Sequence, residues 1–275
     1  MLGRSGFVSF CVQAAHGCLF EWVDEWIEGG IKHEIVHQIE LFGKLGLMST
    51  QVSDKLQLVR QRIERAAVSV GRAPDAVKLL AVSKTMPAQS VREAHAAGQV
   101  AFGENYIQEG VEKIAALADL PLEWHCIGPI QSNKTQLVAS HFDWVHSIDR
   151  LKIAERLSAQ RPAHLPPLQV CLQVNVDGGA NKSGVAPKDL LALAQAVAKL
   201  PSLQLRGLMT IPEPTENELA ARAVHRQAKE LFDSLNAAGL KLDTLSMGMT
   251  ADLEAAIAEG STCVRVGTAI FGSRH

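Results

Sequence analysis

Lys84 is a candidate for covalent chemistry because of its place in the chain. It directly follows an apolar run, residues 79–83, that is typical of a buried strand. An amine at the rim of a core loses hydration, and this loss lowers its pKa. Since the neutral amine is the form that reacts with a carbonyl group, Lys84 could form a Schiff base with a carbonyl ligand.

A second unusual stretch lies near the C-terminus, at residues 264–272. It has Arg265 inside an apolar strand, followed by Gly267 and Thr268, where a phosphate could sit. An arginine in such a strand needs a partner, which could be an acid such as Glu104, solvent on the helix-facing side, or the pyridine nitrogen of a cofactor. A guanidinium keeps its proton, so a ring nitrogen facing Arg265 would stay unprotonated and be a weak electron sink. A reactive lysine, a buried arginine and a phosphate cradle together indicate pyridoxal 5'-phosphate (PLP).

Two glycine-containing loops could form the phosphate cradle. Gly248 precedes a helix expected at residues 251–258 with Thr250 as its cap, and Gly267 and Thr268 follow the last strand. Each loop alone is explained by a tight turn. Together they favour a phosphate site, because barrel enzymes commonly bind phosphate in the loops after strands seven and eight.

Further polar or sulfur-containing side chains stand at the ends of the expected strands. Asn175 could donate to a ring oxygen or cap its strand, and the sequence leaves both open. His125 is interpreted as a hydrogen-bonded core residue rather than a catalyst. No catalytic residue and no metal ligand is predicted, and the remaining candidates for the cofactor site are Asn105, Met209 and Ser246.

The elements that must position these residues alternate regularly. Eight apolar runs, each followed by a helical pattern, predict a single-domain α/β fold, a TIM-type (β/α)8 barrel preceded by an amphipathic helix at residues 53–70. The runner-up, an open doubly wound sheet, would want a glycine-rich turn after the first strand, and none is present. Helix caps are expected at Asp149 and, as a capping box, at Thr215 with Glu218. The strands are expected at residues 78–83, 100–102, 123–127, 144–148, 168–176, 203–210, 244–246 and 263–266.

Residues 1–47 differ from the rest of the chain. We expect them to be a poorly ordered extension or an upstream translation artefact, with the barrel domain at residues 48–275 beginning at Met48. Within the extension, His33-Glu34-Ile35-Val36-His37 matches the zinc-protease pattern of two histidines four residues apart. No clear third ligand follows, so we interpret the match as coincidence.

Composition limits the partners. The net charge of -2 over 275 residues provides no basic field for nucleic acid. No apolar run is long enough to span a membrane, and the five cysteines contain no CxxC pair. Buried thiols in a reduced compartment are the simplest interpretation, which predicts a cytoplasmic protein.

The motifs taken together resemble the pyridoxal phosphate homeostasis protein family, from about residue 53 to residue 274. The resemblance implies a barrel like the N-terminal domain of alanine racemase, which belongs to fold-type III of the PLP proteins, with PLP held on Lys84 as an internal aldimine. It also implies that Ser246, Gly248, Gly267 and Thr268 hold the phosphate and that Arg265 faces the ring nitrogen. The stretches that carry it are residues 81–84, 102–109, 125–128, 131–134, 207–212, 246–249 and 265–272.

Two classes of function follow from this resemblance. The first is a PLP carrier without established catalysis that serves PLP homeostasis and could supply PLP-dependent apoenzymes. The second is an amino-acid racemase. Racemisation usually needs acid–base groups on both faces of the substrate carbon, and the racemases with this barrel take the second from an additional β-domain. The only tyrosine is Tyr106, and the chain nearly ends after the eighth strand, so a carrier, expected as a monomer, is favoured.

Overall fold

The structure is a computed structural model, and it describes the backbone of residues 32–178, 183–215 and 217–272, with side chains from residue 51 onward. Two compact units divide the chain, Met1–Ser49 and Thr50–His275. The second unit holds the barrel and every candidate site residue. Residues 1–31, which make up most of the expected extension, lie outside the described residues.

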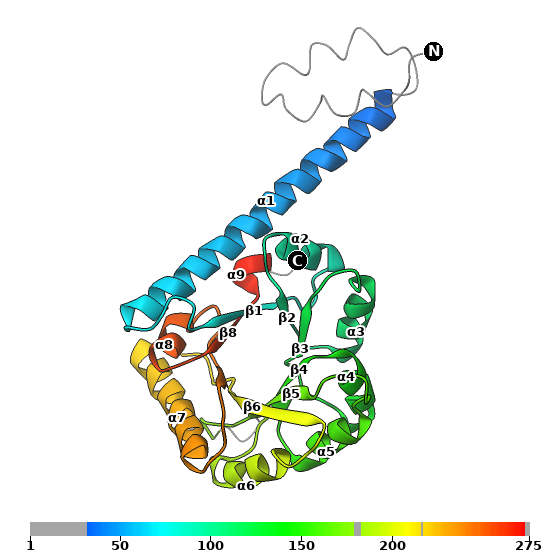
Figure 1. The fold of residues 1–275 in the computed structure, drawn as a ribbon. Coiled ribbons are helices and arrows are strands. Elements are labelled where there is room, and N and C mark those ends of the chain that lie inside the picture. The colour runs from blue at the N-terminus through cyan, green and yellow to red at the C-terminus, as the bar shows by residue number, and fades with distance from the viewer. Residues whose placement is uncertain (1–31, 179–182, 216, 273–275) are drawn as a thin grey trace. The chain divides into compact units, whose positions relative to one another are not determined.

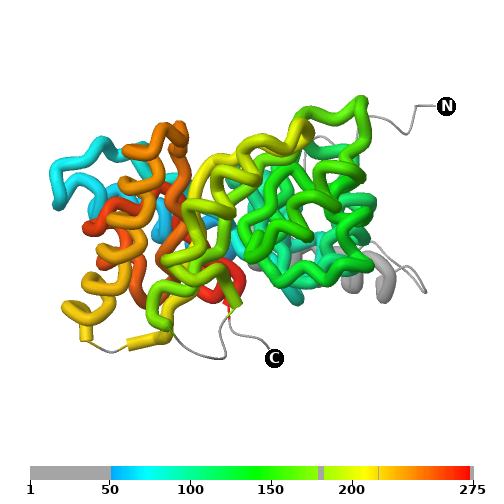
Figure 2. The backbone as a smooth tube through the Cα atoms, turned by 90° about the horizontal axis from the view of Figure 1, so that it is seen from below, coloured from blue at the N-terminus to red at the C-terminus, as the bar shows by residue number. Residues whose placement is uncertain are grey.

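Eight parallel strands form a closed barrel in which each strand pairs with the next and β8 pairs with β1 (Figure 1). This confirms the predicted (β/α)8 fold. Figure 2, turned by 90°, shows the consecutive strand–helix units following one another around the barrel wall. The strands are β1 Lys78–Val82, β2 Ala101–Glu104, β3 Glu123–Cys126, β4 Trp144–Ile148, β5 Leu168–Gln173, β6 Leu203–Met209, β7 Thr244–Ser246 and β8 Cys263–Val266.

Helices surround the strands, and the main apolar core lies between the two layers. The first helix begins at Lys32, well before the predicted residue 53, and no proline interrupts residues 32–52. Its apolar stripe, which includes Leu56, Val59 and Ile63, is buried as its spacing predicts. The helices are α1 Lys32–Ser69, α2 Ala88–Ala96, α3 Ile107–Ala116, η1 Ser132–Lys134, α4 Thr135–His141, α5 Leu151–Gln160, α6 Pro187–Val197, α7 Glu218–Ala237, α8 Leu253–Ala258 and α9 Thr268–Phe271.

The predicted helix caps are wrong. Arg150 takes the N-cap position of α5, and Asp149 instead accepts a hydrogen bond from the Arg150 guanidinium at 2.7 Å. Asn217 caps α7, since its amide oxygen accepts from the backbone amide of Leu219 at 2.9 Å. Thr250 lies in a turn before α8, whose N-cap is Asp252. Of these three N-cap residues, only Asn217 accepts hydrogen bonds from helix amides through its side chain.

Other features of the described residues bear on function. No helix among them is long and apolar enough to cross a membrane. Cys126, Cys171 and Cys263 are free and buried. Burial raises the pKa of the Cys126 thiol to about 12 and that of Cys263 to about 11, so these thiols are unreactive at neutral pH. The His33–His37 motif falls within α1, where the side chains lie outside the described residues.

Candidate functional site

Lys84 is half-buried in the loop that follows β1, at the carboxyl end of the barrel. The next residue, Thr85, has a positive φ of 64°, a conformation that costs energy for a residue with a Cβ atom. The backbone amide of Thr85 donates to Glu109 Oε1 at 2.6 Å, and this bond helps to hold the turn. The backbone on the C-terminal side of Lys84 is therefore fixed by helix α3.

A buried lysine fixes the other side of Lys84. Lys113 Nζ donates to the backbone oxygen of Ser83 at 2.6 Å and to Glu109 Oε1 at 2.6 Å. It also donates to Glu104 Oε1 at 2.8 Å, and the Ser83 hydroxyl donates to the same oxygen at 2.6 Å. Burial raises the pKa of Glu104, although its hydrogen bond to Lys113 opposes the shift. Sequence reasoning missed Lys113, whose helical spacing of four residues from Glu109 was the available signal.

Arg265 projects into the barrel interior and is only 4% exposed. Its Nη1 donates to the backbone oxygen of Ser246 at 2.7 Å and to the Ser246 hydroxyl oxygen at 2.8 Å. Its Nη2 donates to the backbone oxygen of Thr210 at 2.7 Å. The considered acid partner, Glu104, is instead paired with Lys113. Burial lowers the pKa of Arg265, but a guanidinium stays charged, so a cation is held here by uncharged oxygen atoms.

The loop after β7 is braced from several elements. Gly248 has a φ of +93°, and a Cβ atom there would lie 2.5 Å from the Cβ atom of Ala256. Asp252 Oδ1 accepts from the backbone amide of Met249 at 2.7 Å, and Asp252 Oδ2 lies 2.9 Å from His225 Nε2. The loop is thus tied to α7 and α8, and only glycine fits at position 248.

The loop after β8 lies against β1. A Cβ atom on Gly267 would lie 3.0 Å from the backbone oxygen of Val82, two residues before Lys84. Thr268 follows and is exposed. The close approach therefore brings the second candidate phosphate loop beside the end of β1, two residues before Lys84.

The remaining candidates differ in their surroundings. Asn105 follows β2, and its buried Oδ1 has no hydrogen-bond partner among the described residues, as is also true of Thr210 Oγ1. Such orphaned oxygens fit a site that receives a polar ligand. Asn175 is half-buried just after β5, and its backbone amide donates to Val185 at 3.0 Å. Met209 is fully buried and packs with Trp144 and Cys171.

His125 does not lie at the carboxyl end of the barrel, although the strand ends expected from the sequence place it there. It lines a cavity at the amino-terminal end together with Lys78 and Glu123, which begin β1 and β3. The predicted strand end at residue 127 made it look like a rim residue. It is a buried, hydrogen-bonded core residue, as predicted.

Comparison with known proteins identifies close relatives. A family model of the alanine racemase N-terminal domain matches residues 55–275. The pyridoxal phosphate homeostasis protein of Pseudomonas aeruginosa is 64% identical over 227 residues, which cover 82% of this chain and 97% of the relative. The protein of the same name from Escherichia coli K12 is 54% identical over 226 residues, covering 81% and 97%.

Solved structures show the same fold. PipY of Synechococcus elongatus, solved with PLP bound, has a TM-score of 0.71 at 40% identity and covers 81% of this chain and all 100% of its own. Alanine racemase from Corynebacterium glutamicum has a TM-score of 0.61 at 15% identity, covering 80% of this chain and 62% of its own. The racemase likeness concerns the fold alone.

Proposed function

The chain belongs to the pyridoxal phosphate homeostasis protein family, and from this membership we propose that it binds PLP and serves PLP homeostasis. The observation that carries the proposal is the buried Arg265, a cation held by three hydrogen bonds to uncharged oxygen atoms inside the same barrel whose first strand leads into the loop with Lys84. The solved relative that contains PLP, PipY, supports it.

Lys84 would hold the cofactor covalently through its side-chain nitrogen. When bound, PLP supplies an aldehyde that forms a Schiff base with an amine. Lys113 and Glu109 fix the backbone on both sides of Lys84, so its side chain starts from a defined position. Arg265 would face the ring nitrogen, and because a guanidinium donates without releasing its proton, the nitrogen would stay unprotonated.

The phosphate would be held where two loops meet the carboxyl end of the barrel. Added Cβ atoms on Gly248 and Gly267 would press on Ala256 and on the backbone of Val82, so close packing of both loops requires glycine at these positions. Thr268 directly follows Gly267, and Ser246 stands two residues before Gly248. Asn105, Asn175 and Met209 complete the proposed cofactor site. Asn105 contributes the buried, unpartnered amide oxygen.

Lys84 is directly testable as the attachment site. The purified protein, mixed with PLP, is expected to gain a visible absorbance band that the Lys84→Ala variant lacks. Lys78→Ala is the matched control, because Lys78 begins the strand that Lys84 follows. A Lys84→Ala variant that colours as strongly as the wild type would refute the assignment.

That the protein is a carrier rather than a racemase is a separate proposal. An unprotonated ring nitrogen is a weak electron sink and does not favour removal of the α-proton. Exchange of the α-hydrogen of alanine in D₂O is therefore expected to be no faster with the loaded protein than with free PLP. Faster exchange would favour the racemase.

We further propose that the protein acts in the cytoplasm as a monomer and passes PLP to PLP-dependent apoenzymes. An apoenzyme mixed with the loaded protein should recover activity as the visible band of the donor declines. Light scattering of the loaded protein should give the mass of one chain. An apoenzyme that gains activity only after the donor is denatured would contradict delivery.

A further inference from the structure

A line of hydrogen-bonded side chains runs through the barrel interior to Arg265. Glu123 Oε1 lies 2.8 Å from His125 Nε2, and His125 Nδ1 lies 2.9 Å from His146 Nε2. His146 Nδ1 lies 2.9 Å from the Ser246 hydroxyl oxygen, which Arg265 Nη1 contacts at 2.8 Å. Four strands, β3, β4, β7 and β8, therefore contribute to one continuous chain.

The far end of this chain opens into a cavity of about 300 Å³ at the amino-terminal mouth. The Glu123 side chain is 41% exposed, whereas His125 and His146 are buried. The Trp144 ring stacks on His125 at 5.3 Å between centroids, and the Arg206 guanidinium lies 4.8 Å from the centre of the same tryptophan ring. These contacts fix the plane of the first imidazole.

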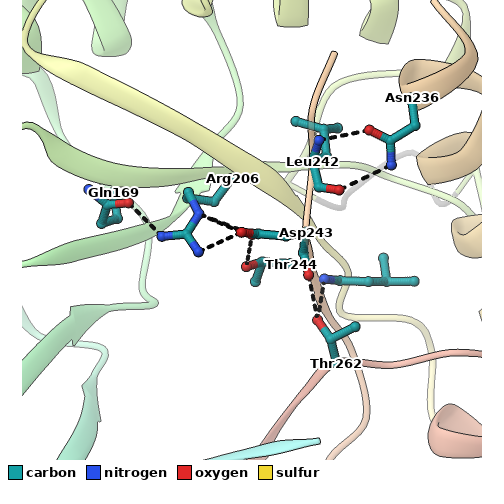
Figure 3. A network of polar contacts seen from close by, with 8 residues as sticks. Gln169, Arg206, Asn236, Leu242, Asp243, Thr244 and Thr262 are labelled. Carbon is teal, nitrogen blue, oxygen red and sulfur yellow. Dashed lines mark hydrogen bonds and ion pairs between the residues drawn. The ribbon is translucent and has the colours of Figure 1, made fainter. Parts of the chain in front are cut away.

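A polar network braces the mouth beside the chain. Arg206 forms an ion pair with Asp243 at 2.6 Å and donates to Gln169 Oε1 at 2.7 Å (Figure 3). Asp243 in turn accepts from the Thr244 hydroxyl at 2.8 Å. This network lies at the same end of the barrel as Glu123, but it takes no part in the series of hydrogen bonds that leads to Arg265.

The surroundings of both histidines favour the neutral imidazole. Burial lowers the pKa of His125, although Glu123 opposes the shift, and burial lowers the pKa of His146 further below its usual value, with His125 and Arg265 adding to the effect. A neutral imidazole has one donor and one acceptor nitrogen. The charged groups near the two rings or lining the same cavity are Asp75, Lys78, Glu123, Asp143, Arg206, Asp243 and Arg265.

Only one arrangement of protons satisfies every member. The Glu123 carboxylate can only accept, so His125 carries its proton on Nε2 and accepts at Nδ1. His146 must then donate from Nε2 and accept at Nδ1, which directs the Ser246 hydroxyl proton toward His146. The Ser246 oxygen is left to accept from Arg265, so all the hydrogen bonds point from Arg265 toward Glu123 and reinforce one another.

We propose that Glu123, His125 and His146 are positioning residues for Arg265, because their chain fixes the direction of the Ser246 hydroxyl and turns its acceptor side toward the guanidinium. The consequence for the cofactor rests on the proposed function. In the PLP-loaded protein, Arg265 held in this way would present a fixed hydrogen-bond donor to the ring nitrogen. The Glu123 carboxylate, at the opposite end of the barrel, would set the direction of the hydrogen bonds that hold Arg265.

The first test uses the full chain without cofactor and histidine-selective isotope-labelled NMR. Both His125 and His146 are expected as neutral imidazoles protonated on Nε2. Glu123→Gln, whose amide can donate as well as accept, should populate the reversed proton positions. Asp75→Asn removes a charge at the same cavity, outside this series of hydrogen bonds, and should leave both rings unchanged. A wild-type His146 protonated on Nδ1, or rings indifferent to Glu123→Gln, would overturn the proposal.

The second test follows the visible absorbance of the PLP-loaded protein against pH. Glu123→Gln is expected to shift this profile, and Asp75→Asn to keep that of the wild type. A profile unchanged by Glu123→Gln in a protein that binds PLP overturns the link to Arg265 while leaving PLP binding intact. A wild-type protein that gains no visible absorbance band with PLP would refute the proposed function instead. The NMR result would then still decide whether the series of hydrogen bonds from Glu123 to Arg265 exists.

Discussion

Gly248 shows most clearly how a single residue shapes the proposed phosphate loop. Its φ of +93° disfavours any L side chain, and a Cβ atom would also collide with Ala256 at 2.5 Å. Gly239 offers a matched comparison, because its φ is +91° but nothing lies within 4 Å of its added Cβ atom. The two positions separate backbone strain from steric collision.

We predict that Gly248→Ala lowers the free energy of unfolding by about 2–4 kcal/mol, the sum of the strain and the collision. Gly239→Ala should cost only about 1–2 kcal/mol, from strain alone. Urea unfolding of both variants measures the difference. Equal losses would mean that the loop moves aside freely and is not braced as described.

Residue type and position revealed part of the site in advance. Lys84 and Arg265 stand out because a charge within an apolar run needs an explanation. Lys113 did not stand out, since a lysine on a helix is usually solvated and its burial depends on where β2 and the loop after β1 pass. Which residues a side chain contacts depends on the tertiary structure, and sequence spacing alone does not reveal it.

At the scale of elements, helix α3 controls the loop that carries Lys84. The Lys113 side chain is 7% exposed, and its ammonium group forms ion pairs with Glu104 and Glu109 and donates to the backbone oxygen of Ser83. We predict that Lys113→Met lowers the free energy of unfolding by about 3 kcal/mol, because it leaves a buried carboxylate without its cation. The variant should also attach PLP to Lys84 more slowly, because the loop is released.

The control for this substitution is Lys229→Met. Lys229 pairs with Asp233 at the same four-residue spacing, but at the surface. Its loss should change the free energy of unfolding by no more than about 0.5 kcal/mol. Chemical denaturation of both variants decides the matter, and a Lys113→Met protein as stable as the control would show that the buried cluster does not stabilise the loop.

Glu259 links helix α7 to the end of α8 and makes this junction sensitive to acid. Hydrogen bonding to Arg226 and Arg222 keeps the pKa of Glu259 below its usual value, although burial opposes the shift. A carboxylate with a depressed folded pKa stabilises above its unfolded pKa, and this contribution disappears as the pH falls through the folded pKa.

We therefore expect Glu259→Gln to be less stable than the wild type at neutral pH. The difference should shrink as the pH falls below the usual carboxylate range and vanish once Glu259 is protonated in both states. Thermal unfolding over a pH series measures this. A difference that stayed constant into acid would mean that the ion pairs contribute nothing.

Element types were predictable, whereas their ends were not. Apolar runs at regular intervals indicated all eight strands, because parallel strands covered on both faces must be apolar throughout. The predicted caps at Asp149, Thr215 and Thr250 were wrong, because α5, α7 and α8 begin one or two residues later than predicted, and only α7 has a side-chain cap, which is Asn217.

At the scale of the whole molecule, closure of the barrel explains how Glu123 at one end can be linked to Arg265 in the interior. Closure pairs β8 with β1 and places Arg265 opposite Leu80 in register. Ordering eight strands around one axis lets a side chain from β3 reach Arg265 through β4 and β7. A sequence can indicate closure, but the inward alignment of Glu123, His125 and His146 emerges only when the strand register is known.

We propose that residues 48–275 form the complete cofactor-binding unit. The family match begins at residue 55, and the second compact unit begins at Thr50. A chain that starts at Met48 is expected to unfold at the same urea concentration as the full chain and to bind PLP equally tightly. A truncated chain that aggregates or loses PLP affinity would assign a role to residues 1–47.

The central claim is that Lys84 is the residue to which PLP attaches. The direct measurement is the intact mass of the full chain after incubation with PLP and reduction with borohydride, followed by peptide mapping. We predict a mass increase of one reduced PLP group, located on Lys84 and missing from Lys84→Ala. No mass increase in the wild type, or a group mapped to another lysine, would contradict the account.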